Sequence, residues 1–120
     1  YRPAAVADQK IKKETMTSPD LKLTLNPDIL LGLGERKQNQ VLVGFAAETN
    51  DVIAHGREKL VRKNLDLLVA NDVSSPESGF HVDENQVSLL TPDGHVFSYP
   101  RMAKEDIGTL IIEKIASIMK

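Results

Sequence analysis

Cysteine and tryptophan are both absent from this chain of 120 residues, and only five residues are aromatic, three Phe and two Tyr. Without a thiol there is no disulfide framework, no thiolate nucleophile and no cysteine-ligated metal site. No apolar segment approaches the ~20 residues that a bilayer-spanning helix needs, and no secretory signal opens the chain. We therefore expect a cytoplasmic protein with no membrane partner.

A strong charge of either sign is also missing. The formal net charge is −2 and the pI is near 5.9, which gives no general attraction to nucleic acid. A nucleic-acid partner is therefore not expected, and any basic site must be a local arrangement. The 41% of hydrophobic residues suffice for the core of one domain, or of part of a larger one. Because the chain begins at Tyr1 without an initiator methionine, we expect a fragment.

Three common site patterns are missing as well. His55, His81 and His95 lack the ligand spacing of a zinc site, so no metal-binding residue is predicted. The glycines of Gly32-Leu33-Gly34 have no third glycine at dinucleotide-binding spacing, and they follow a helix signal instead of a strand. No serine lies in a nucleophile-elbow pattern.

The most informative stretch reads as strand, helix and strand. Residues 41–47 and 65–70 are short apolar runs, typical of strands that are covered on both faces of a parallel sheet. Residues 51–64 are long enough for the crossover helix that parallel neighbours need. We predict an α/β, Rossmann-like fold with a mostly parallel sheet, flanking helices and a C-terminal β-hairpin plus helix. Ligands bind beyond the carboxyl ends of such strands, here residues 45–50 and 70–74.

A helix signal precedes this stretch. Asn26 is a favoured N-cap, Pro27 suits the first helical position, and Asp28 in the first turn faces the positive end of the helix dipole. We expect the helix to fade at Gly32 and Gly34.

The remaining elements are shorter signals. Residues 21–25 alternate strictly between apolar and polar, which predicts a strand with one solvent-exposed face. Residues 86–90 and 96–99 predict a hairpin joined through 91–95. A last helix, beginning near Ala103, is expected to cover the sheet with an apolar stripe. The stripe consists of Ile107, Leu110, Ile111, Ile115 and Ile118.

Two sets of lysines allow two interpretations each. Lys59 and Lys63 share one face of the crossover helix at i and i+4, and neither has an acidic partner at helical spacing. The partners considered are those within the predicted helix. Spacing alone favours a solvated basic face, whereas the affinity of lysine for phosphate allows a polyphosphate site. The run Lys10-Ile11-Lys12-Lys13 is either a soluble loop or a flap that closes over a triphosphate.

The predicted ligand edge carries three further candidates. Phe45 suits either core packing or stacking on a base or ribose. Asn71 and Asp72 suit either the orientation of a substrate or the capping of the following loop. The turn at residues 26–28 is either a cap alone or a helix N-terminus whose free N–H groups face a ligand.

Five blocks of residues occur in order along the chain: Pro3-Ala4-Ala5-Val6-Ala7-Asp8-Gln9-Lys10-Ile11-Lys12-Lys13, Asn26-Pro27-Asp28-Ile29-Leu30, Val43-Gly44-Phe45-Ala46-Ala47-Glu48-Thr49, Arg62-Lys63-Asn64-Leu65-Asp66 and Ala70-Asn71-Asp72-Val73. Together they resemble the carboxyl-terminal half of the phosphopantothenate–cysteine ligase family, in the form that ends the bacterial bifunctional coenzyme A biosynthesis protein. Each block alone is weak, but the ordered set is specific. Residues 79–120 agree with the family in layout only.

The resemblance implies a two-step reaction. The family activates the carboxylate of 4′-phosphopantothenate with CTP, which gives an acyl-cytidylate and pyrophosphate, and the cysteine amine then displaces CMP to form an amide. It also implies Mg²⁺ bound with CTP and held mainly by the phosphates. FMN would belong only to the decarboxylase part of the parent protein, and the intact protein would be a homodimer.

Roles for single residues follow from the same resemblance. Lys10 matches a flap lysine needed for acyl-cytidylate formation, and residues 8–20 would form the flap. The implied nucleotide contacts are Lys10, Pro27, Asp28, Ile29, Leu30, Phe45, Lys59 and Lys63.

Two features of the family are missing from this sequence. A nucleotide-contacting Asp of the family would precede Tyr1, and a glycine-rich turn lies in its amino-terminal half. Asp8 falls in a neighbouring variable part and receives no role. We therefore expect residues 1–120 to be a single domain, a C-terminal fragment of a larger ligase domain that is inactive alone. The alternative is a non-catalytic nucleotide-binding module of Rossmann-like fold.

Overall fold

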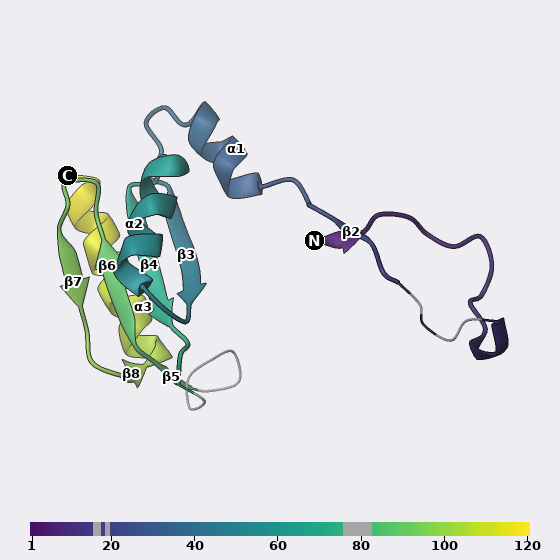
Figure 1. Cartoon of the computed structure of the whole chain (residues 1–120). Helices are drawn as coiled ribbons and strands as arrows, with labels where there is room; N and C mark the ends of the chain where they lie inside the picture. The colour runs from purple at the N-terminus through teal and green to yellow at the C-terminus, as the bar shows by residue number, and fades with distance from the viewer. Residues whose placement is uncertain (16–17, 19, 76–82) are drawn as a thin grey trace.

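The computed structural model describes residues 1–15, 18, 20–75 and 83–120. It divides into an extended N-terminal arm, residues 1–25, and an α/β body formed by the rest of the chain (Figure 1). Residues 16, 17 and 19 of the predicted flap lie outside the described residues, as do residues 76–82, which include His81. The elements in order are β1 (Arg2–Pro3), the 3₁₀ turn η1 (Lys13–Thr15), β2 (Leu23–Thr24), α1 (Ile29–Arg36), β3 (Val43–Glu48), α2 (Val52–Arg62), β4 (Leu67–Asp72), β5 (Glu84–Asn85), β6 (Val87–Leu90), β7 (Val96–Ser98), β8 (Met102–Ala103) and α3 (Lys104–Ile118).

The predicted strand–helix–strand unit is confirmed. β3 and β4 are parallel neighbours, paired from Val43 opposite Leu67 to Glu48 opposite Asp72. α2 forms the crossover between them and lies against β4. The carboxyl ends of the two strands therefore meet at one edge, as the sequence predicts.

The prediction of a mostly parallel sheet is wrong. The main sheet has the order β3-β4-β6-β7, and only the β3–β4 pairing is parallel. β6 runs antiparallel to β4, and β7 runs antiparallel to β6. The predicted hairpin inserts its first strand directly beside β4, and hairpin strands must run in opposite directions. The sheet is therefore mixed.

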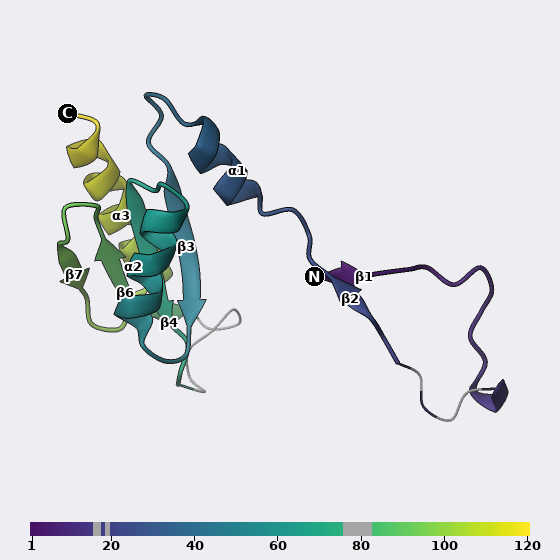
Figure 2. The ribbon, with the colours of Figure 1, turned by 45° about the horizontal axis from the view of Figure 1, so that its top comes forward.

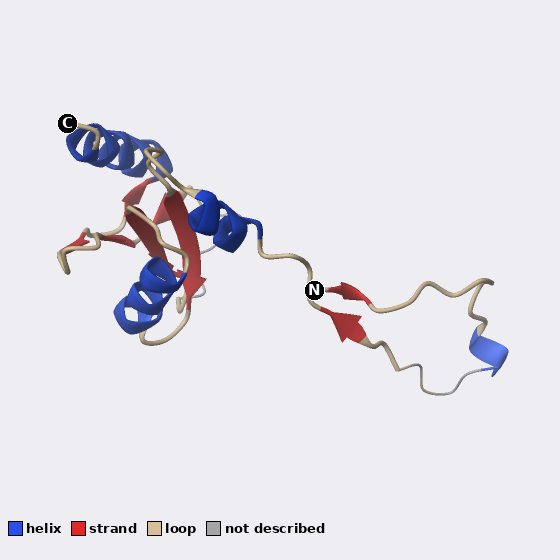
Figure 3. Ribbon diagram, turned by 90° about the horizontal axis from the view of Figure 1, so that it is seen from above, coloured by secondary structure: helices blue, strands red, loops and turns tan. Residues whose placement is uncertain are grey.

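The core consists of one apolar cluster on each face of the sheet. α2 and α3 lie on opposite faces (Figure 3). Successive residues of β4 alternate between the faces, so that Leu68 joins the α2 side and Leu67 the α3 side, and both are almost fully buried. The predicted stripe of α3 is confirmed in part by the burial of Ile107 and Ile111.

α1 begins and ends differently from the prediction. Its N-cap is Asp28, not Asn26, because the Asp28 carboxylate accepts a hydrogen bond from the Leu31 N–H. The helix also continues through both glycines to Arg36. A Cβ at Gly34 would lie 1.9 Å from the backbone oxygen of Lys63, so this glycine marks the close approach of α1 to the end of α2.

The arm is an extended excursion from the body (Figure 2). β1 and β2 pair antiparallel, with Arg2 opposite Thr24. The predicted strand at 21–25 is reduced to Leu23–Thr24, and Leu21, Leu23 and Leu25 are all exposed, so the apolar face of the strand is uncovered. The radius of gyration is 18.8 Å, against about 14 Å for a compact domain of this length.

No helix within the described ranges is long and apolar enough to cross a bilayer.

The glycines of α1 make a matched pair for testing its packing. Gly34→Ala is expected to lower the free energy of unfolding by about 1–3 kcal/mol, because the new methyl group displaces backbone. Gly32→Ala is the control, since nothing lies within 4 Å of its Cβ position. It should raise stability by up to ~1 kcal/mol through helix propensity. Urea unfolding measures both, and a neutral Gly34→Ala would show that α1 does not pack against α2.

Candidate functional site

A half-buried carboxylate at the end of β3 holds two side chains of α2. The Lys59 ammonium donates a short hydrogen bond to Glu48 Oε1. His55 Nδ1 lies 3.5 Å from the other oxygen, Oε2. Because His55 and Lys59 are at i and i+4, both project from the same helix face toward β3. The Glu48 side chain is only 12% exposed, so this contact is largely shielded from solvent.

A second lysine of α2 pairs with the start of α1. Lys63 Nζ lies 3.0 Å from Asp28 Oδ2, and Asp28 Oδ1 accepts the Leu31 N–H at 3.0 Å. These two contacts, the backbone N–H first and Lys63 second, hold the pKa of the Asp28 carboxyl below its usual value. One carboxylate therefore caps α1 and ties it to the C-terminal end of α2.

The interpretation of Lys59 and Lys63 as a solvated basic face is wrong. Each lysine pairs with a carboxylate that comes from another element, and the Lys63 side chain is only 17% exposed. Helical spacing rules consider only partners within the helix, so they could not reveal Glu48 and Asp28. The outcome is two ion pairs, one from α2 to β3 and one from the end of α2 to the start of α1, and each fixes one ammonium group in place.

One residue of the predicted turn at 27–30 takes part in these ion pairs. Asp28 contacts Lys63, whereas Ile29 is exposed to solvent and Leu30 packs against the core cluster on the α2 side. Asn26, the predicted cap, bonds instead to Arg2 and to the backbone oxygen of Tyr1, and so holds the two ends of the arm together.

Phe45 does not pack in the core, because 70% of its surface is exposed. Ala46 packs in the α2-side cluster and Val43 against the α3-side cluster. Strand alternation therefore places Phe45 on the sheet face opposite α2 and its lysines. Phe45 and Lys59 approach the same strand end from opposite faces.

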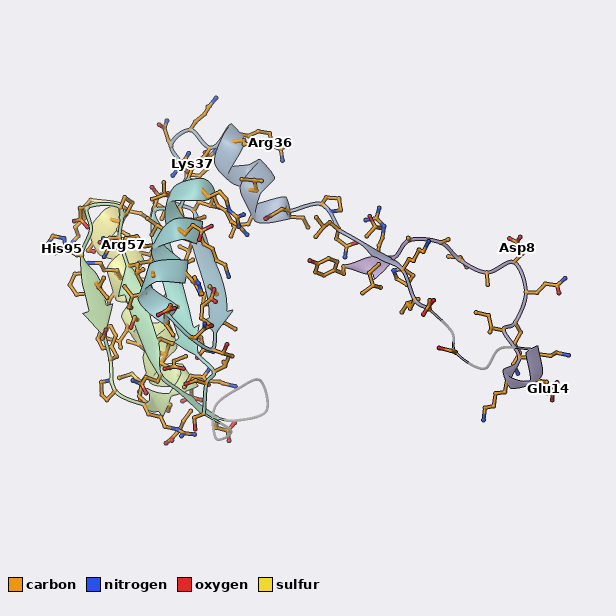
Figure 4. The ribbon with its side chains drawn as sticks, in the orientation of Figure 1. Asp8, Glu14, Arg36, Lys37, Arg57 and His95 are labelled. Carbon is orange, nitrogen blue, oxygen red and sulfur yellow. The ribbon has the colours of Figure 1, made fainter. Side chains whose placement is uncertain are left out.

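Lys10 lies in the arm, away from the lysines of α2. Asp8 and Glu14, which flank it in the chain, mark the far end of the arm in Figure 4. Residues 10–14 line an open hollow there, and the Lys10 side chain is exposed. The structure therefore does not bring Lys10 together with Lys59 and Lys63.

Asp72 and Asn71, at the end of β4, differ in their surroundings. Asp72 Oδ1 accepts the hydroxyl and the N–H of Ser74 at 2.6 Å and 2.9 Å. The hydroxyl first and the N–H second hold the pKa of Asp72 below its usual value, so this carboxylate caps the following loop. Asn71 Oδ1 is buried without a hydrogen-bond partner among the described residues, so it keeps an unused acceptor.

Sequence reasoning missed Glu48 and His55 as members of this site. Glu48 ends a predicted strand at the predicted ligand edge, and that position was a usable signal. His55 was examined only for metal-ligand spacing. Within the described parts of the chain, no three His, Cys, Asp or Glu residues converge as a metal site.

Comparison with known proteins assigns the family. A family model described as the DNA/pantothenate metabolism flavoprotein C-terminal domain matches residues 1–119. The chain belongs to this family. This confirms the resemblance identified from the five sequence blocks.

Other members of the family match over almost the whole chain. The coenzyme A biosynthesis bifunctional protein CoaBC of Bacillus subtilis is 46% identical over 122 residues, which cover 100% of this chain and 29% of that protein. CoaBC of Escherichia coli K12 is 44% identical, over 98% of this chain and 29% of that protein. The chain thus spans less than a third of these curated relatives.

A solved member of the family has the same fold. The crystal structure of the C-terminal domain of CoaBC matches with a TM-score of 0.70 and 34% identity, over 82% of this chain and 45% of that one. The mixed α/β architecture is therefore that of the CoaBC C-terminal domain.

The two roles of Asp28 can be separated by substitution. Asp28→Ala removes both the helix cap and the partner of Lys63, whereas Asp28→Asn keeps a capping oxygen and loses only the charge. We expect Asp28→Ala to lower the melting temperature more than Asp28→Asn. Equal losses would show that the cap contributes nothing.

The same pair predicts a pH dependence. Because the folded-state pKa of Asp28 is lowered, its stabilisation is complete above the usual pKa of 3.8 and is lost as the pH falls through the folded-state pKa. The wild type should therefore lose more stability than Asp28→Asn when urea midpoints at neutral pH are compared with those well below 3.8. Identical losses in the two proteins would contradict the lowered pKa.

Proposed function

We propose that this chain is the nucleotide-binding part of a CTP-dependent ligase that joins 4′-phosphopantothenate to cysteine in coenzyme A biosynthesis. The observation that carries this proposal is the pair of fixed ammonium groups: Lys59 is bound to Glu48 at the carboxyl end of β3, and Lys63 is bound to Asp28 at the start of α1. The family membership and the 44–46% identity to CoaBC proteins support it. In the parent protein, further strands beside the free edge of β3 would complete a Rossmann-like sheet.

The proposed reaction needs activation because a carboxylate is a poor electrophile. A carboxylate oxygen of 4′-phosphopantothenate attacks the α-phosphorus of CTP. The bond from this phosphorus to the bridging oxygen breaks, and pyrophosphate leaves with the electrons of that bond. The cysteine nitrogen then attacks the acyl carbon, CMP leaves, and the amine releases a proton. Positive groups that meet the charge on pyrophosphate lower the barrier of the first step.

Lys59 and Lys63 suit the role of triphosphate ligands. An ammonium has three N–H donors, so each lysine can keep its carboxylate and still donate to phosphate oxygens. Phe45 would stack on the base or ribose from the other side of the β3 end, since its exposed ring lies on the opposite face. Asn71, with an unused buried acceptor, would face the second substrate.

Lys10 would act from the arm as the catalytic flap residue. Because it lies far from α2, the arm must either fold back over its own body or reach a second subunit. The exposed leucines of the arm support a partner surface, in keeping with a homodimer of the intact protein. Mg²⁺ would bind with CTP mainly through phosphate oxygens, and FMN would be confined to the decarboxylase part. The proposed setting is the cytoplasm.

The flap role is tested by Lys10→Gln in the full-length protein that carries this chain. Pyrophosphate release from CTP that depends on 4′-phosphopantothenate should be abolished, while the melting temperature stays unchanged because the side chain is exposed. Near-normal release would remove Lys10 from the reaction. Wild-type protein that binds CTP without releasing pyrophosphate would instead be a non-catalytic nucleotide-binding module.

Residues 1–120 alone should bind CTP weakly and form no product. Lys59 and Lys63 are present, so part of the triphosphate affinity is local to this chain. The chain covers only 45% of the solved CoaBC domain, and a misplacement of the carboxylate by ~1 Å can cost about a hundredfold in rate. The fragment is supplied with CTP, magnesium, 4′-phosphopantothenate and cysteine. Amide formation at the rate of the complete protein would refute this.

A further inference from the structure

Glu48 is placed to control one of the lysines of the site. Its backbone is fixed at the end of β3, where it pairs with Asp72 and its carbonyl accepts the Val73 N–H at 2.9 Å. Its side chain points toward α2, on the same face as Ala46, and it receives Lys59 on one oxygen and faces His55 with the other. A rigid strand thus carries the carboxylate that orients a flexible cation.

Such a contact orders the lysine side chain before a ligand binds. A free lysine side chain samples many rotamers, and this freedom is lost when the ammonium binds a phosphate. The Lys59 side chain is 35% exposed and the Glu48 side chain is 12% exposed. The ammonium is therefore held by a more deeply buried carboxylate and remains accessible from solvent. Its remaining N–H donors are free to meet an anion without a further search of rotamers.

We propose that Glu48 is a positioning residue that holds Lys59 in the geometry required for binding of the CTP triphosphate. The inference rests on the function proposed above and adds a residue to its site. Glu48 does not touch the nucleotide; it acts through Lys59. His55 faces the second oxygen of Glu48 and so keeps the carboxylate turned toward the helix.

A purely electrostatic role and a positioning role of Glu48 predict opposite changes in the Kd for CTP when its charge is removed. A carboxylate near a triphosphate site repels the ligand, so loss of the Glu48 charge should tighten CTP binding if only the overall field matters. If Glu48 positions Lys59, its loss should weaken binding even though the site becomes more positive. The direction of the change in Kd decides between the two.

The matched control is Glu58→Gln. Glu58 adjoins Lys59 on the same helix and has an exposed side chain. Its substitution removes the same charge from the position next to Lys59 in the helix without removing the anchor of Lys59. We expect Glu58→Gln to leave CTP affinity unchanged or slightly higher.

The experiment is a double-mutant cycle on CTP affinity in the full-length protein, measured by calorimetry with magnesium present. Glu48→Gln should raise the Kd for CTP about five- to tenfold, the loss of one charge-assisted contact. In a Lys59→Ala background the same substitution should cause no weakening, because the lysine that it positions is gone. The KM for CTP should rise more than kcat falls.

Each result has one meaning. Tighter binding by Glu48→Gln, or equal weakening with and without Lys59, would overturn the positioning role. A wild type that fails to bind CTP would refute the proposed function, which is a separate failure. If Glu48→Gln does not fold, Glu48→Asp serves in the same cycle. It keeps the charge but shortens the reach, and it should also weaken binding only when Lys59 is present.

Discussion

The burial of β4 on both faces is the constraint on which the rest of this structure depends. Leu67, Leu68 and Ala70 have at most 1% of their surface exposed, and alternate residues feed the two apolar clusters. α2 can approach this strand closely because Gly56 has no side chain; a Cβ there would lie 2.9 Å from Leu68. That close contact fixes the distance and rotation of α2. The polar face of the helix is thereby aimed at the end of β3 and the start of α1.

The charged residues of the site follow from that placement. α2 offers Lys59 and Lys63 one turn apart, and each meets a carboxylate on a different neighbouring element. Paired charges at partly exposed positions add little to stability. Their consequence is geometric, because two long side chains that would otherwise sample many rotamers are held at defined positions. A site that binds a polyanion benefits from such order, since less entropy is lost when the ligand arrives.

The sequence was sufficient wherever the pattern is local. The apolar runs located β3 and β4, the crossover length located α2, and the periodic isoleucines located α3. It was insufficient for the order of the sheet, because the apolar run of β4 needs cover on both faces but does not show that the first hairpin strand, β6, lies beside it and runs antiparallel. Gly34 was misjudged because its reason is a backbone contact with Lys63, distant in sequence. The partners of the lysines were hidden for the same reason. Strand parity, by contrast, could have placed Phe45 and Glu48 on opposite faces from sequence alone.

The arm has an apolar pattern that the core of this chain does not cover. The alternating pattern of residues 21–25 stabilises a strand only when another surface covers the leucines. Within the described residues these leucines remain exposed. The body is complete without the arm, since both apolar clusters are built from residues after Leu25. The arm is instead anchored at its base, where Arg2 donates to Asn26 and to the backbone oxygen of Leu25. Exposed apolar residues gathered on one segment are typical of a surface that packs against another.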